Sequence, residues 1–136
     1  MRPVAALEEG ADAPTTYRLH IRLSASLSVA VGRLGTFVFP AGDYVYTGSA
    51  RRNFEARVAR HCRRGTVERP KPLRWHIDYL LAREEATVLA VERLTMAECA
   101  ANRTVGGTVV APGFGASDCK AGCVSHLRYL GRRASE

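Results

Sequence analysis

The side chains best suited to chemistry follow one another within residues 42–61. The first part of this stretch is rich in aromatic and β-branched residues, which favours a strand that carries Tyr46. We expect Gly48-Ser49-Ala50 to end that strand in a turn, because glycine tolerates backbone conformations that other residues avoid. A helical segment with Arg57 and His61 follows. This order would bring a phenol, backbone amides and guanidinium groups to one phosphate.

The helix predicted after this turn presents two faces with different residues. Asn53 is a suitable N-cap, and apolar residues recur from Phe54 onwards at helical spacing. Arg57 and His61 are four residues apart, so they share a second face. That face is either a phosphate-binding surface, with His61 binding phosphate or relaying a proton, or simply a solvated helix face.

Positive charge is concentrated in one segment. The chain has a net charge of +7, and the 24 residues from Arg51 to Arg74 contain nine basic and two acidic residues. A concentrated basic segment indicates a polyanionic partner, and the arginine side chain is suited to bind phosphate through two hydrogen bonds. The alternative is a coding bias that enriches arginine on solvated surfaces. Our phosphate-binding candidates are Gly48, Ser49, Arg51, Arg52, Arg57, Arg60 and Arg64.

Short strands must position these residues in the first half of the chain. Residues 17–23 alternate apolar and polar side chains, which predicts a strand with one buried face. Further strands are predicted at 27–31 and 36–39, before the tyrosine strand. Because tight turns join these strands, we expect an antiparallel meander.

The second half of the chain mixes helix and strand signals. Residues 75–81 could form a short helix or a strand, and residues 87–91 predict a buried strand. Thr95-Met96-Ala97-Glu98 matches a capping box that opens a helix. The segment 123–130 could be a last strand or a helix. The fold class predicted is α+β.

The length indicates one domain, at 15–131, between a flexible tail at 1–14 and a short tail at 132–136. We find neither an export signal nor an apolar run of the roughly 18–20 residues that a membrane helix needs. We therefore expect a cytoplasmic protein that does not contact membranes, with its four cysteines reduced.

Cys119, Cys123 and His126 have a spacing that could bind zinc. They supply three ligands, and a fourth would have to be Cys99, Cys62 or His76. Because no paired Cys-x₂-Cys knuckle is present, we expect free thiols in a packed turn rather than a zinc site.

Together these motifs resemble the GIY-YIG nuclease superfamily, and within it the Uri-type family of small stand-alone domains. Tyr46-Thr47-Gly48 is similar to the second half of the name motif, and Thr16-Tyr17 to the first half, without its leading glycine and isoleucine. The resemblance covers nearly the whole chain, and the other matching positions are Ser49-Ala50, Arg57, His61, residues 75–81, Glu98 and residues 114–119.

The resemblance implies a small, mostly antiparallel sheet flanked by helices, here with an extra N-terminal strand pair between the tyrosine motifs. It implies that Glu98 holds one Mg²⁺ or Mn²⁺ ion, where the alternative is that Glu98 only closes the capping box. It implies that Tyr17 acts as base or orients water, helped by the Arg57 charge, while Tyr46 shapes the site. Alternatively, both are half-buried sheet tyrosines.

The function expected from the resemblance is metal-dependent endonuclease activity on DNA or a related nucleic acid. Its catalytic residues would be Tyr17, Tyr46, Arg57, His61 and Glu98. A small catalytic module of this kind could need a protein partner to choose its substrate. The rival readings are a non-catalytic nucleic-acid-binding module on the same scaffold and a zinc-stabilised interaction domain with a basic face.

Overall fold

The computed structural model describes residues 15–50, 54–62, 73, 75–95, 97–116 and 123–132. Several residues singled out above lie outside these ranges, namely both predicted tails apart from Arg132, and Arg51, Arg52, the predicted N-cap Asn53, Arg64 and Cys119. Within the segment rich in arginine, the described arginines are Arg57 and Arg60.

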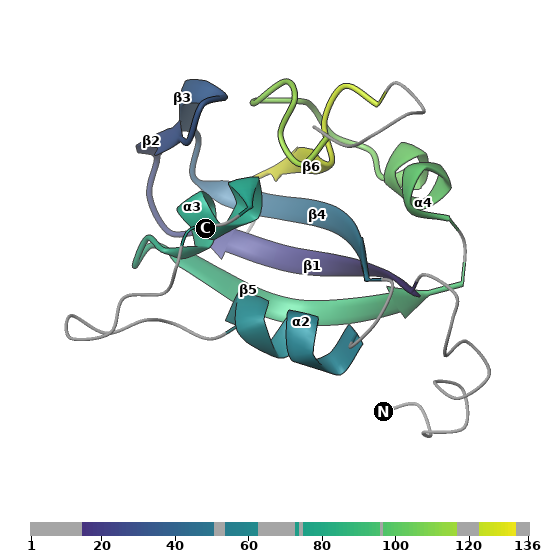
Figure 1. The fold of residues 1–136 in the computed structure, drawn as a ribbon. Helices are drawn as coiled ribbons and strands as arrows, with labels where there is room; N and C mark the ends of the chain where they lie inside the picture. The colour runs from purple at the N-terminus through teal and green to yellow at the C-terminus, as the bar shows by residue number, and fades with distance from the viewer. Residues whose placement is uncertain are drawn as a thin grey trace.

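Four strands form an antiparallel sheet at the centre of the molecule (Figure 1). They are β1 (Thr15–Leu23), β4 (Gly42–Ala50), β5 (Ala86–Leu94) and β6 (Leu127–Gly131), in the order β5-β1-β4-β6. The alternation predicted for residues 17–23 is confirmed, because Tyr17, Leu19, Ile21 and Leu23 are buried while the intervening side chains are only partly covered. The α+β class is confirmed.

The remaining strands, β2 (Leu27–Val31) and β3 (Gly35–Phe39), pair only with each other among the described strands. This hairpin is the predicted extra strand pair, but the predicted continuous meander is wrong. A strand has two hydrogen-bonding edges, and those of β1 are taken by β4 and β5. The chain therefore leaves the sheet after β1, forms the hairpin and returns as β4.

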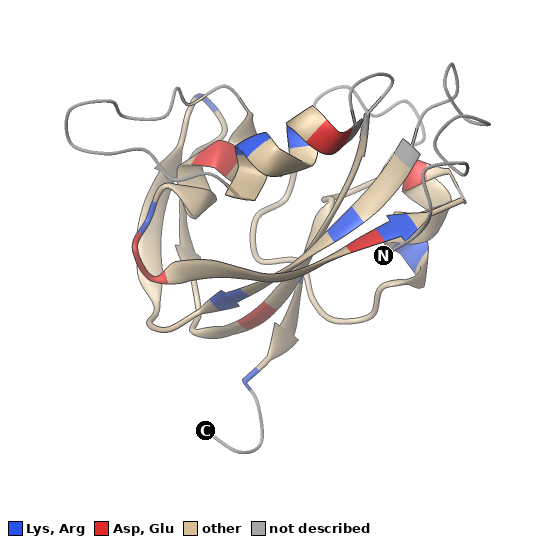
Figure 2. Ribbon diagram, turned by 90° about the horizontal axis from the view of Figure 1, so that it is seen from below, with Lys and Arg blue, Asp and Glu red and all other residues tan. Residues whose placement is uncertain are grey.

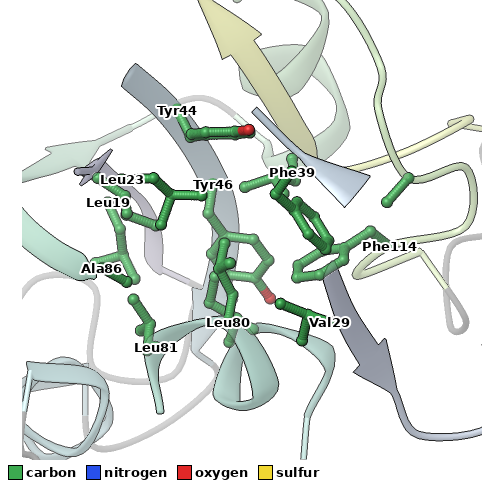
Figure 3. Close-up of a cluster of buried hydrophobic side chains, with 14 of the residues drawn as sticks. Leu19, Leu23, Val29, Phe39, Tyr44, Tyr46, Leu80, Leu81, Ala86 and Phe114 are labelled. Carbon is green, nitrogen blue, oxygen red and sulfur yellow. The ribbon is translucent and has the colours of Figure 1, made fainter. Parts of the chain in front are cut away.

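Three helices complete the described fold, α2 (Phe54–Cys62), α3 (His76–Leu81) and α4 (Glu98–Thr104). The ambiguity over residues 75–81 resolves as helix, because Ile77, Leu80 and Leu81 fall on one buried side of α3. Figure 3 shows leucines of α3 in one cluster with Tyr46, Phe39 and Phe114. The sheet face that carries the tyrosines is therefore part of the hydrophobic core.

Strand β5 corrects one expectation from the sequence. Residues 87–91 were predicted to be buried, yet Leu89 and Val91 are 47% and 39% exposed. The strand is at an edge of the sheet, so it has a neighbouring strand on one side only, and all four residues from Leu89 to Glu92 are exposed. A run of apolar residues did not distinguish an edge strand from a central one.

Asp78 fixes the junction between α2 and α3. Its carboxylate is fully buried, accepts a hydrogen bond of 2.9 Å from Arg60 Nη1 and another of 2.9 Å from the Trp75 backbone N–H. Removing one partner of a buried ion pair leaves the other without compensation.

We therefore expect Asp78→Ala to lower the free energy of unfolding by about 3–5 kcal/mol. Glu55→Ala is the matched control, because Glu55 is an exposed acidic residue on α2, and should change that free energy by at most about 0.5 kcal/mol. Urea denaturation of the two variants measures both values. Equal midpoints would contradict the role given to Asp78.

Candidate active site

Gly48 and Ser49 lie inside β4, which continues to Ala50. The predicted glycine turn is therefore wrong. Gly48 pairs with Tyr17 across the β1–β4 ladder, and a Cβ atom at Gly48 would lie 2.7 Å from the Cζ and hydroxyl oxygen of Tyr17. The glycine is needed for space beside the phenol ring, not for a special backbone angle.

Gly48→Ala should displace the Tyr17 ring, because the ring is 1% exposed and packed in the core. We expect a loss of about 1–3 kcal/mol in the free energy of unfolding. Gly106→Ala is the control, since a Cβ there meets nothing within 4 Å. Thermal unfolding of both proteins makes the comparison, and equal stability of the two variants would show that the ring yields without cost.

The two phenols and His61 form one buried cluster. The Tyr17 hydroxyl lies 2.9 Å from His61 Nε2, within hydrogen-bond distance. The Tyr46 ring packs edge-on against His61, with 6.3 Å between ring centroids. Both tyrosines belong to the hydrophobic core. Packing in the sheet and membership of the candidate site are therefore compatible for these two side chains.

Burial dominates the ionisation of these phenols. Burial raises the pKa of Tyr17 to about 12, although the charge and hydrogen bond of Arg57 act in the opposite direction. Burial also raises the pKa of Tyr46, and the Tyr17 and Glu98 charges add to the effect. Arg57 therefore favours the Tyr17 phenolate, as expected, but desolvation outweighs the nearby charge.

Ser49 joins residues from two helices. Arg57 Nη1, on α2, donates a hydrogen bond of 3.2 Å to the Ser49 carbonyl oxygen. The Ser49 hydroxyl donates one of 2.7 Å to Glu98 Oε1, at the start of α4. Strand β6 pairs with β4 only as far as Tyr46, so this contact lies where β4 extends beyond its neighbour. A guanidinium and a carboxylate thereby meet at one residue.

Glu98 does not close a capping box with Thr95. Helix α4 begins at Glu98 itself, with Ala97 as the N-cap, so the carboxylate is not at the third helical position that a capping box requires. Its Oε2 atom instead lies 2.7 Å from His126 Nδ1.

Burial raises the pKa of Glu98, but other contacts outweigh this effect. Hydrogen bonds from His126 and Ser49, together with the charges of His126 and Arg57, bring the pKa below its ordinary value. The Glu98 charge in turn raises the pKa of Tyr17 and of Tyr46. The carboxylate is therefore electrostatically coupled to the phenol cluster.

Trp75 and His126 are two members of this region whose contacts sequence reasoning missed. The Arg57 and Arg60 guanidinium groups lie 4.5 and 4.6 Å from the Trp75 ring centroid, at cation–π distance. Trp75 is the only tryptophan of the chain and begins the segment 75–81, whose match to the family motif is the signal that pointed to it. His126 was considered only with cysteines, and no local pattern connects it to Glu98.

The structure thus brings together the five predicted catalytic residues, Tyr17, Tyr46, Arg57, His61 and Glu98. Among the phosphate candidates, Gly48, Ser49 and Arg57 are in the same region, whereas Arg60 is paired with Asp78. Figure 2 shows that basic and acidic residues are interspersed over the described part of the chain. The roles of these residues stay predictions.

Fold and site define a small α+β domain with tyrosine, arginine, histidine and glutamate side chains gathered at one end of its sheet. A family model described as "Domain of unknown function DUF123" matches residues 16–136. The chain belongs to this family. Searches of curated proteins and of solved structures gave no match. Among the described residues, no helix is both long enough and apolar enough to cross a membrane.

Proposed function

We propose that the chain is a divalent-metal-dependent endonuclease that hydrolyses phosphodiester bonds in DNA or a related nucleic acid. The observation that carries this proposal is the meeting of Arg57 and Glu98 at Ser49, beside two buried phenols. Phosphodiester hydrolysis needs cationic groups beside the phosphate oxygens and a water molecule positioned for attack. The order of motifs that resembles GIY-YIG nucleases supports the same activity.

The donor set fits a hard divalent ion such as Mg²⁺ or Mn²⁺. Ser49 and His126 each contact one oxygen of the partly exposed Glu98 carboxylate, and a carboxylate offers about four lone-pair positions. One carboxylate combined with phosphate oxygens and water is a common arrangement for Mg²⁺. Glu98 would hold one ion, which when bound would supply Lewis-acid charge to the phosphate.

The side chains around this carboxylate have separate tasks. Arg57 binds the phosphate, and its contact with the Trp75 ring holds the guanidinium in place. Tyr17 keeps its proton at neutral pH because its pKa is about 12, so it orients the attacking water rather than deprotonating it. The Tyr17 oxygen accepts a hydrogen bond from that water, and the Tyr17 hydroxyl donates its own hydrogen bond to His61 Nε2. Tyr46 shapes the site.

A substrate panel tests the activity. The purified chain is incubated with branched, damaged, duplex and single-stranded DNA in the presence of Mg²⁺, Mn²⁺ or a chelator. We expect cutting of at least one substrate with either ion and none with chelator. Cutting that is equally fast with chelator would exclude the metal, and a complete lack of cutting would exclude the nuclease.

The second candidate is a non-catalytic nucleic-acid-binding module on the same scaffold. It is favoured by the contacts that already engage both Glu98 oxygens and by the high pKa of Tyr17. Such a module would bind DNA with an affinity that falls steeply with salt and would cut none of the substrates. For either function we propose a cytoplasmic setting, in which Cys62, Cys99 and Cys123 stay reduced, and a protein partner that directs the domain to its substrate.

A further inference from the structure

A second cluster of ligand-type side chains lies next to the candidate active site. Cys99 is on α4, whereas Cys123 and His126 precede β6. One ligand atom from each of the three residues lies within 4.8 Å of the other two. The two cysteines are partly buried and His126 is buried, so the cluster is largely shielded from solvent.

We infer that Cys99, Cys123 and His126 bind zinc. A tetrahedral zinc ion with Zn–S bonds of about 2.3 Å holds its ligand atoms about 3.8 Å apart. The separations here exceed that value by at most about 1 Å, a difference that side-chain rotation can close. Two thiolates and one imidazole form a soft donor set, which favours zinc over Mg²⁺. Three protein ligands leave a fourth position for water or another ligand.

The contacts of His126 determine which of its nitrogen atoms serves the metal. Nδ1 lies 2.7 Å from Glu98 Oε2 and 3.3 Å from the Thr47 carbonyl oxygen, so we assign Nε2 as the ligand. Zinc-binding histidines commonly donate their other N–H to a carboxylate, which orients the ring. Glu98 is the orienting carboxylate here, and it is adjacent to Cys99 in the chain.

This arrangement gives the zinc a defined place in the fold. It would tie the start of α4 to the segment before β6, which are distant in sequence. It would also fix the Glu98 carboxylate through His126. The sequence left Cys99 as one of three candidate partners for Cys123 and His126, and the fold places Cys99 beside them.

Metal analysis of the purified full chain tests the site without reference to nuclease activity. The protein is prepared under reducing conditions, and we expect about one zinc per chain in the wild type. Cys99→Ser and Cys123→Ser should each lose that zinc. Cys62→Ser is the matched control, because Cys62 is an exposed cysteine at the end of α2, and it should keep the metal.

Two further measurements remain informative if a cysteine variant fails to fold. Co²⁺ added to the metal-free wild type should give the thiolate-to-cobalt absorption of a tetrahedral site. Glu98→Gln should retain that spectrum while zinc affinity falls about 10–100-fold, because only the orienting contact changes. Absence of zinc and of the cobalt spectrum, or zinc content that survives both Cys99→Ser and Cys123→Ser, would overturn the site. A wild-type mass two hydrogens lower, with a Cys99–Cys123 disulfide, would overturn it as well.

Discussion

Glu98→Gln is expected to reduce metal-dependent DNA cleavage at least about 100-fold, an effect typical of losing a main electrostatic group at a reacting centre. The amide keeps the shape of the side chain but removes the negative charge that would hold the divalent ion. DNA binding, which depends mainly on cationic side chains, should change by less than about threefold. Initial cleavage rates and binding isotherms, measured on one preparation, give both values.

Glu92→Gln is the matched control for this experiment. Glu92 is also a glutamate in a hydrogen-bonded pair, with His20 at 2.9 Å, but it is on an exposed strand of the sheet. It should cleave at the wild-type rate. Zinc content is measured in the same samples, so that loss of the carboxylate charge is separated from loss of the proposed zinc. A Glu98→Gln protein that cuts at the wild-type rate would remove Glu98 from the mechanism.

Arg57→Lys is expected to lower the cleavage rate about 100-fold, even though the positive charge is kept. Lysine lacks the planar fork that binds two phosphate oxygens, and it cannot reproduce the flat contact of Arg57 with Trp75. DNA affinity should fall much less than the cleavage rate, because the charge still attracts the phosphate backbone. Single-turnover cleavage and a fluorescence titration of Trp75 separate the two effects.

Arg33→Lys serves as the control, since Arg33 is an exposed arginine in the turn between β2 and β3. Its cleavage rate should match that of the wild type. If Arg57→Lys and Arg33→Lys cut equally well, the bidentate contact with phosphate is not used. In that case Arg57 has only a packing role beside Trp75.

Patterns of period two and short helical spacings were sufficient to predict the parts of the fold that depend on neighbouring residues. The buried row from Tyr17 to Leu23 followed from its alternation. The α2 helix was predicted from the apolar spacing that begins at Phe54, although it is His61 that is buried in α2 while Cys62 is exposed. Both signals arise from local geometry and solvent exposure. They are therefore visible without knowledge of the partners of each element.

The failures concern partners distant in the chain. Gly48 was expected to end a strand, but a glycine is needed there because the Tyr17 ring on the neighbouring strand β1 leaves no room for a side chain. Glu98 matched a local capping pattern, but its partners are Ser49 and His126. No short-range rule could select these contacts, because each depends on how the sheet and α4 come together. The approach of Tyr46 and Arg57 was expected from their order in the chain, whereas the addition of Tyr17 and Glu98 came only from the family resemblance.

Binding of Mn²⁺, followed residue by residue with amide NMR signals, tests the central claim most directly. A paramagnetic ion broadens the signals of nearby nuclei, so small additions of Mn²⁺ report where the ion lies. We predict broadening centred on Ser49, Arg57 and Glu98 in the wild type, and its loss in Glu98→Gln. Broadening centred on another part of the molecule, or equal broadening in both proteins, would contradict the claim that this carboxylate and guanidinium meet around one cation.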